Sequence, residues 1–360
     1  METISLSNQI LELKKQKPKN KKKLSEIIFA RACCSIGIII FHYFCHSKGN
    51  FKLLYLTANS NWGFMFVTCF FCISGSVLYY NYQKINSIKY FYYKRWKSIF
   101  PGYYICFIYF FIKNVFKYHK LFYKGHWVKL IFTIFGMDGY LDYRFKSYFL
   151  IGEWFLGAII LIYLLYPLLS YLMNINIFII HFIAISFYPL LDIKKYFVID
   201  ASKNLITCIY SFYFGMIGLK FFNFFFKNKI IFIISIFLFI VLCYIRISKF
   251  VLIFQIQGFA LYIILIHISK YIMLNRFKVL FIKISALSYN IFLFQHIIIL
   301  DILDVNNPSE WYLHLELLLI TIILTIICSK ILFLVVNDFI NSFFFKKLES
   351  LILNNGLNNT

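Results

Sequence analysis

Two ionisable residues, Arg31 and His42, stand inside an otherwise apolar run, Glu26–His46. They are eleven positions apart, and an α-helix turns about 100° per residue, so both lie within roughly 20° of one helix face. The rise of about 1.5 Å per residue separates them by roughly 16 Å along the axis. Such a helix holds a permanent cation near one end. Near the other it holds an imidazole that can take or give a proton.

Charged groups inside a membrane helix are costly, and they usually face a protein interior or a wet cavity. Arg31 and His42 therefore predict a functional site. A plainer interpretation fits this segment as well: the arginine reaches the inner membrane surface, and a neighbouring helix satisfies the histidine.

The composition of the whole chain supports a membrane setting for this helix. Of the 360 residues, 61% are hydrophobic and 14% are charged, whereas soluble domains are about 25% charged. We therefore predict an all-α, polytopic helical bundle in a membrane. The formal net charge is +23, but the basic residues mostly flank apolar segments, so membrane topology explains them without a nucleic acid partner. The nine cysteines suggest neither a disulfide framework nor a metal site, and we expect no metal.

The pattern of charge and hydropathy predicts a basic cytoplasmic arm (1–25), a membrane domain (26–340) and a short cytoplasmic tail (341–360). The membrane domain has ten apolar segments near the bilayer-spanning length of about 20 residues. They are 27–46, 62–81, 99–117, 150–172, 176–191, 204–222, 229–247, 251–269, 284–303 and 312–336. Residues 127–141 are a candidate for an additional re-entrant or interfacial helix. An even count after a basic arm predicts that both termini of this multi-pass protein of the cytoplasmic (inner) membrane are cytoplasmic.

The second apolar segment contains the pair Ser74-Gly75 among aromatic residues. A small pair of this kind lets another helix approach the backbone closely, and we interpret it first as a packing contact. The alternative is a nucleophilic serine, which needs a base beside it.

A basic stretch precedes the third segment, with Lys94, Arg95 and Lys97 close together and Pro101 shortly after them. We predict a cytoplasmic loop here, with the helix starting near the proline. The ordinary explanation of its charge is anchoring by the positive-inside rule. The functional explanation is a phosphate-rich cytoplasmic ligand.

Together these three stretches resemble the membrane-bound acyltransferase-3 family. In that family the first helix carries arginine, ten residues and then histidine, as at Arg31 and His42. The second helix carries Phe-Phe-x-x-Ser-Gly, which is similar to Phe70–Gly75. A basic pattern ending in Ile-x-Pro precedes the third helix, as in Lys94–Pro101.

Later stretches extend the resemblance to about residues 24–340. They are Gly152–Leu156 with Tyr163 and Pro167, Phe214–Met216, and Ser288–His296. The chain also departs from the family pattern. Ser98 stands where a second arginine is common, and Lys97 is its candidate replacement. Thr68 occupies a position that is often acidic, and Phe292 replaces a tyrosine.

The resemblance implies a membrane-bound O-acyltransferase, expected to be an acetyltransferase. Its donor would be cytoplasmic acetyl-coenzyme A, and its acceptor a hydroxyl of an extracytoplasmic envelope polysaccharide or lipid-linked glycan. Arg31, Lys94, Arg95 and Lys97 could bind the donor phosphates. His42 would be the general base or would carry the acyl group itself, and the sequence leaves both roles open. The other expected partners are membrane lipids.

Two further ionisable residues, Glu153 and His296, are expected near the outer face. Glu153 could orient His42 or bind the sugar, and an interfacial carboxylate without a chemical role is the alternative. His296 is a candidate for catalysis or acceptor binding, although core and interfacial histidines are common.

Two other classes of function stay open. A flippase or transporter of lipid-linked sugars also suits a basic, aromatic bundle, but it predicts repeated, Gly/Pro-broken helices, and we find none in the sequence. A non-catalytic membrane sensor could keep the same fold, and the presence of both Arg31 and His42 argues against it.

Overall fold

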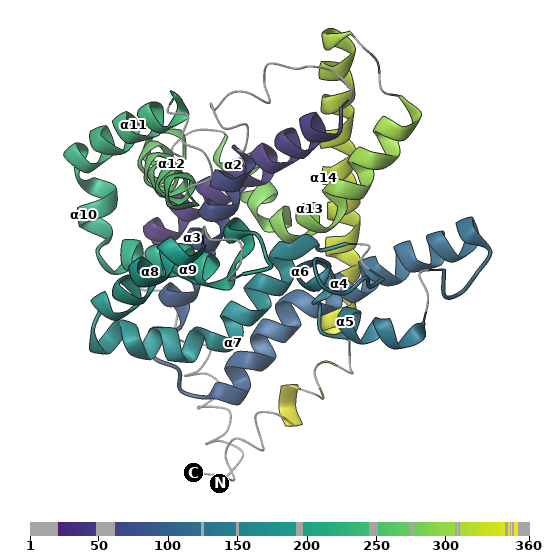
Figure 1. Ribbon diagram of the computed structural model, residues 1–360, viewed down its shortest axis with the longest axis horizontal. Coiled ribbons are helices and arrows are strands. Elements are labelled where there is room, and N and C mark those ends of the chain that lie inside the picture. Colours follow the sequence, from purple (N-terminus) through teal and green to yellow (C-terminus); the bar gives the residue numbers. More distant parts are fainter. Residues whose placement is uncertain are drawn as a thin grey trace.

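The computed structural model describes residues 21–47, 62–123, 126–148, 151–191, 197–244, 251–273 and most of 277–351. Every regular element in this part of the chain is a helix (Figure 1). The predicted all-α bundle is therefore confirmed. Residues 1–20 of the predicted arm and 352–360 of the predicted tail lie outside the described residues. Residues 21–25, which we assigned to the arm, form the start of the first described helix.

Seven described helices are long and apolar enough to cross a membrane. They are α2 (Lys21–His46), α3 (Gly63–Asn81), α4 (Ile88–Tyr118), α7 (Glu153–Ile175), α12 (Val251–Ile272), α13 (Lys278–Val305) and α14 (Trp311–Asn341). Three apolar helices are shorter: α8 (Phe178–Leu191), α9 (Leu205–Lys220) and α11 (Lys229–Tyr244). Each predicted apolar segment thus has a helix, and the protein is polytopic. Ten complete crossings stay a prediction, because the three short helices fall below the usual spanning length.

Short helices fill the connections between these elements. The predicted interfacial segment 127–141 contains η2 (Trp127–Lys129), α5 (Leu130–Ile134) and α6 (Asp138–Leu141). Two more, η3 (Ala201–Lys203) and α10 (Phe222–Lys227), flank α9.

Helix α4 corrects our prediction for the basic stretch. It begins at Ile88, where the side chain of Ser87 accepts a hydrogen bond from the backbone N–H of Tyr90, and Pro101 lies inside it. The predicted loop is wrong because the serine cap starts the helix early. The proline, which we took as a start signal, removes only one backbone donor from a long helix. The basic residues therefore occupy fixed positions around a helix.

Helices α2 and α3 lie at the centre of the bundle. Helix α2 contacts α3, α12 and α13, and α3 also contacts α9 (Figure 1). A Cβ atom added to Gly75 of α3 would collide with the carbonyl oxygen of Phe212, and one added to Gly215 of α9 would collide with that of Cys72. The packing interpretation of the Ser74-Gly75 pair is confirmed for the glycine.

Candidate functional site

A cavity of about 550 Å³ is lined by residues of α2, α3, α4, α7, α13 and the segment before α9. Five α2 residues line it: Arg31, Ser35, Ile38, Phe41 and His42. Arg31, Ser35, Ile38 and His42 follow one another at three or four residues, which is the spacing of one helix face, and Phe41 adjoins them, so the predicted common face is confirmed. Because Arg31 and His42 both line it, the cavity follows α2 for roughly the 16 Å between them. We call its two regions the arginine end and the histidine end.

The arginine end combines two guanidinium groups with aromatic rings. Arg95 reaches it from α4, with its guanidinium carbon 5.3 Å from the ring centroid of Tyr82 and 5.8 Å from that of Tyr163. One terminal nitrogen donates to the Tyr82 hydroxyl at 3.4 Å. Tyr163 is also an electrostatic neighbour of Arg31. The aromatic rings hold the planar guanidinium of Arg95 by stacking and cation–π attraction.

These two arginines have no counter-charge in the described part of the chain. None of the ion pairs found there involves Arg31 or Arg95. The Nε atom of Arg95 is buried and has no hydrogen-bond partner among the described residues. Buried polar groups are normally satisfied. The arginine end therefore has the charge and the free donor that an anionic ligand needs.

Lys94 and Lys97 are placed differently from Arg95. Both lie on one side of α4, three residues apart, and pair with Glu349, at 3.5 Å and 2.9 Å between nitrogen and carboxylate oxygen. Neither is among the cavity-lining residues, whereas Arg95, about 100° around the helix from Lys94, is. The four predicted donor-binding cations thus separate into two pairs. A donor-binding role for the two lysines stays a prediction.

Glu349 is an ordinary carboxylate held by these lysines. Partial burial raises its pKa, but the hydrogen bond from Lys97 and the positive charge of Lys94 outweigh burial. The pKa of Glu349 therefore lies below its usual value, and the carboxylate is ionised at neutral pH.

The histidine end brings His42 together with Glu153 and His296, the two residues expected near the outer face. Glu153 Oε2 lies 3.7 Å from Nε2 of His42, and Glu153 Oε1 lies 3.3 Å from Nδ1 of His296. The carboxylate is 16% exposed and the two rings are 20% and 35% exposed. A carboxylate between two imidazoles can orient both rings and stabilise either one when it is protonated.

The backbone presents the Glu153 carboxylate in a strained conformation. Gly152 and Glu153 both have positive φ angles, 86° and 36°, immediately before α7 continues. Glycine tolerates this region, but a side chain usually avoids it. Gly139 of α6 packs against the backbone of Glu153, where a Cβ atom would collide with its carbonyl group. Packing from α6 therefore helps to hold the carboxylate at the first position of α7.

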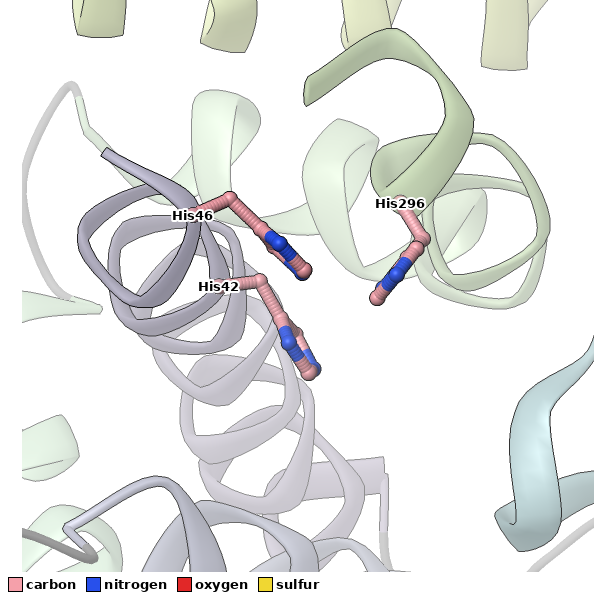
Figure 2. A group of neighbouring side chains, drawn as sticks. All are labelled: His42, His46 and His296. Carbon is pink, nitrogen blue, oxygen red and sulfur yellow. The ribbon is translucent and has the colours of Figure 1, made fainter. Parts of the chain in front are cut away.

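A third histidine, His46, which was not among the predicted site residues, completes a histidine group. It lies one helical turn after His42 on α2, and its ring centroid is 4.8 Å from that of His296 on α13 (Figure 2). The ligand nitrogens of the three histidines lie within 4.8 Å of one another. The available signal was the spacing His-x-x-x-His, which places two imidazoles on one helix face.

The polar segment before α9 was also missed. Asp200, Ser202 and Lys203 line the cavity, and the Lys203 ammonium lies 6.0 Å from the ring centroid of Trp154. The signal was a short polar stretch between two apolar segments. These residues add a charged, hydrogen-bonding wall and an aromatic face near Glu153.

Cys69 and Cys72 are spaced as Cys-x-x-Cys, a pair that was not part of the prediction. Both thiols donate to backbone carbonyls of neighbouring helices, Cys69 to Gly258 and Cys72 to Ser211, each at 3.2 Å. In the described structure this pair joins α3 to α12 and α9.

Comparison with known proteins adds one finding. Residues 24–334 match the family model of an acyltransferase domain of type 3, and this range covers most of the 360-residue chain. Comparison with curated proteins finds no match, and neither does comparison with solved structures.

Proposed function

Since the chain belongs to the acyltransferase-3 family and is a multi-pass membrane acyltransferase, we propose that it acylates an extracytoplasmic glycan. The donor is a cytoplasmic acyl-coenzyme A, with acetyl as the expected acyl group. The acceptor is a hydroxyl of a cell-surface polysaccharide or lipid-linked glycan, and the enzyme resides in the cytoplasmic membrane. The observation that carries the proposal is one cavity that contains two guanidinium groups without an ion-pair partner among the described residues, together with a histidine–carboxylate pair.

The arginine end is the proposed donor site. Coenzyme A carries several phosphate charges, and guanidinium groups bind phosphate through paired N–H donors. Among the described residues, neither Arg31 nor Arg95 forms an ion pair, and Nε of Arg95 has no hydrogen-bond partner. The rings of Tyr82 and Tyr163 hold this guanidinium in place. This end of the cavity faces the cytoplasm in the proposed orientation.

The length of the cavity suits a donor that reaches partway through the membrane. Arg31 and His42 are roughly 16 Å apart, about half of the roughly 30 Å hydrocarbon thickness. A pantetheine arm can bridge such an interval while the phosphates stay with the arginines. The volume of about 550 Å³ is within the range of small-molecule sites, about 300–1,000 Å³.

The histidine end is the proposed reaction site. In one route, His42 takes the proton of the acceptor hydroxyl as its oxygen attacks the thioester carbon. The carbon–sulfur bond then breaks, and the departing sulfur receives the proton. In the other, a ring nitrogen of His42 attacks the thioester carbon, and the carbon–sulfur bond breaks as the thiolate leaves. The acceptor oxygen then attacks the acyl carbon, the carbon–nitrogen bond breaks, and the hydroxyl proton passes through the ring to the sulfur. Glu153 supports either route, because a carboxylate near Nε2 favours the tautomer protonated there and leaves Nδ1 basic.

The segment containing Asp200, Ser202 and Lys203 is the proposed acceptor entrance. It lies on the same cavity as Glu153 and supplies hydrogen-bonding groups for sugar hydroxyls. Trp154, whose ring lies beside Lys203, offers an aromatic face for a sugar ring.

Sealed vesicles that contain the purified protein test the proposal. Radiolabelled acetyl-coenzyme A is placed at the cytoplasmic face, and a glycan acceptor is placed at the opposite face. We expect label on the glycan with the unsubstituted protein and with His181→Ala, which replaces a histidine outside the cavity that pairs with Tyr210. With His42→Ala we expect labelling to be slower by about 10²–10⁴-fold. Glycan that crosses the membrane without being labelled would instead support a flippase. Transfer that needs both substrates on one side would refute the route through the bundle.

A further inference from the structure

The three histidines at the histidine end form a group that glycan acylation does not by itself require. His42 and His46 project from the last turns of α2 toward His296 on α13 (Figure 2). All three are partly buried, and one ligand nitrogen of each lies within 4.8 Å of the others. Glu153 contacts two of them, His42 and His296. The resemblance that predicts His42 does not include His46.

The hydrogen-bonding capacity of these groups leaves lone pairs unused. A neutral imidazole has one N–H donor and one bare nitrogen, and a carboxylate only accepts. Glu153 oxygens lie 3.7 Å from Nε2 of His42 and 3.3 Å from Nδ1 of His296. If these two ring nitrogens carry the protons, each ring keeps a bare nitrogen on its other side. His46 contributes a third. Three imidazoles whose ligand nitrogens lie within 4.8 Å of one another can offer three lone pairs to one cation.

The position of the group on α2 also favours a cation. His46 is the last residue of α2, and the C-terminal end of a helix carries a partial negative charge. Glu153 adds a full negative charge beside two of the rings. The partial exposure of the rings gives an ion access from water.

We propose that His42, His46 and His296 bind one divalent transition-metal ion of the zinc class, with Glu153 as fourth ligand or as partner of the ligating rings. Imidazole nitrogens select zinc, copper, nickel or cobalt over magnesium and calcium. Tetrahedral zinc sites have Zn–N distances of about 2.0–2.1 Å, which places the nitrogens roughly 3.4 Å apart. Nitrogens now within 4.8 Å reach that spacing through rotation of their side chains.

Metal binding at the three histidines should inhibit acyl transfer, an expectation that rests on the proposed function. A metal ion on His42 occupies the lone pair that takes the proton or the acyl group. Metal binding and catalysis by His42 therefore exclude each other, and zinc supplied at the histidine end inhibits acyl transfer.

Metal binding is tested first, without reference to activity. Purified protein is dialysed against zinc and the bound metal is measured, and cobalt provides a visible absorption spectrum. We expect one zinc per chain, a cobalt spectrum of a nitrogen-ligated four-coordinate site, and no displacement by excess magnesium or calcium. His46→Ala and the size-matched His46→Gln should each weaken zinc binding by more than the roughly 10–100-fold that loss of a second-shell partner costs. His181→Ala is the control and should bind normally.

Elution as a monodisperse species shows that each variant is folded. If the unsubstituted protein binds no zinc, or if folded His46→Gln binds it as tightly as the control, the metal site is refuted.

Inhibition is measured separately, as the fall of each protein's transfer rate relative to its own metal-free rate. We expect the unsubstituted protein to lose activity as the site fills and His46→Gln to resist the same zinc concentration. Zinc that binds without inhibiting refutes the exclusion of catalysis by metal, and the site itself stands. If no transfer occurs under any condition, the proposed function fails while the binding result still decides the metal site.

Discussion

Replacing Arg95 by alanine is expected to raise the KM for acetyl-coenzyme A by about 10–150-fold, with little change in kcat. A hydrogen bond to a charged group contributes about 1.5–3 kcal/mol, and each 1.4 kcal/mol corresponds to a factor of ten. The phosphates stay in place while the thioester reacts, so Arg95 binds the ground state and the transition state alike. Loss of such uniform binding changes KM and leaves kcat.

Two further variants identify which property of Arg95 matters. Arg95→Lys keeps the positive charge but loses the planar fork that binds phosphate through two donors, so its KM should be intermediate. Lys97→Ala removes the same charge two residues along α4. Lys97 is hydrogen-bonded to Glu349 at 2.9 Å and does not line the cavity. The KM of the Lys97→Ala protein should therefore rise less than that of Arg95→Ala, because Lys97 acts on the phosphates only through a long-range, screened charge.

The assay measures release of free coenzyme A at saturating acceptor over a range of acetyl-coenzyme A concentrations. Thermal unfolding is compared in parallel, because Arg95 also packs against Tyr82, Phe91 and Tyr163. An unchanged KM in a folded Arg95→Ala protein would refute a donor site at the arginine end. An equal rise of KM in Arg95→Ala and Lys97→Ala would mean that both residues affect donor binding through charge alone. That result would contradict a direct contact between Arg95 and the phosphates.

Three further outcomes follow from the structure. His42→Ala should lower the transfer rate by about 10²–10⁴-fold, the usual contribution of a general base, and a near-normal rate in well-expressed protein would remove His42 from the chemistry. Gly75→Ala should destabilise the protein by at least about 1–3 kcal/mol through overpacking against the Phe212 carbonyl, and an unchanged melting temperature would contradict the close α3–α9 contact. Glu349 has a lowered pKa, so its contribution is full above the ordinary value of about 4.3 and is lost as pH falls through the lower folded-state pKa. Glu349→Gln should therefore melt below the unsubstituted protein near pH 7, with the difference vanishing in acid, and a gap that persists at low pH would refute the ion pairing.

The helical periodicity of the sequence was sufficient to predict that Arg31 and His42 lie on one face of α2. Arg31 and His42 line one cavity because an eleven-residue spacing returns almost to the same helix direction. No comparable local signal places Glu153 and His296 beside His42. They come from α7 and α13, far along the chain, and only the packing of three helices brings them together.

The basic stretch shows how an error in one element changes the assignment of a site. A loop has no fixed faces, so we expected Lys94, Arg95 and Lys97 to act as one positive rim. In helix α4 the two lysines lie on the face that meets Glu349, with which both form ion pairs. Arg95 lies on a different face and lines the cavity. The cap residue Ser87 is visible in the sequence, but proline is common at the first position of a helix, and Pro101 therefore predicted a later start than the structure has. His46 was missed because two histidines one turn apart are a weak pattern until the third, on α13, is seen.

The left-handed backbone at Glu153 lowers the stability of the fold, while the side chain at the same position supplies the carboxylate of the candidate site. A residue with a side chain loses roughly 1–2 kcal/mol in that conformation, and glycine would avoid this loss. By backbone energy alone, a chain with Gly-Gly at 152–153 would be the easier one to fold. Glycine, however, would leave no carboxylate beside the imidazoles of His42 and His296. Selection for thermal stability alone would therefore tend to erase the site, whereas selection for activity would keep a molecule below the greatest stability that its fold allows.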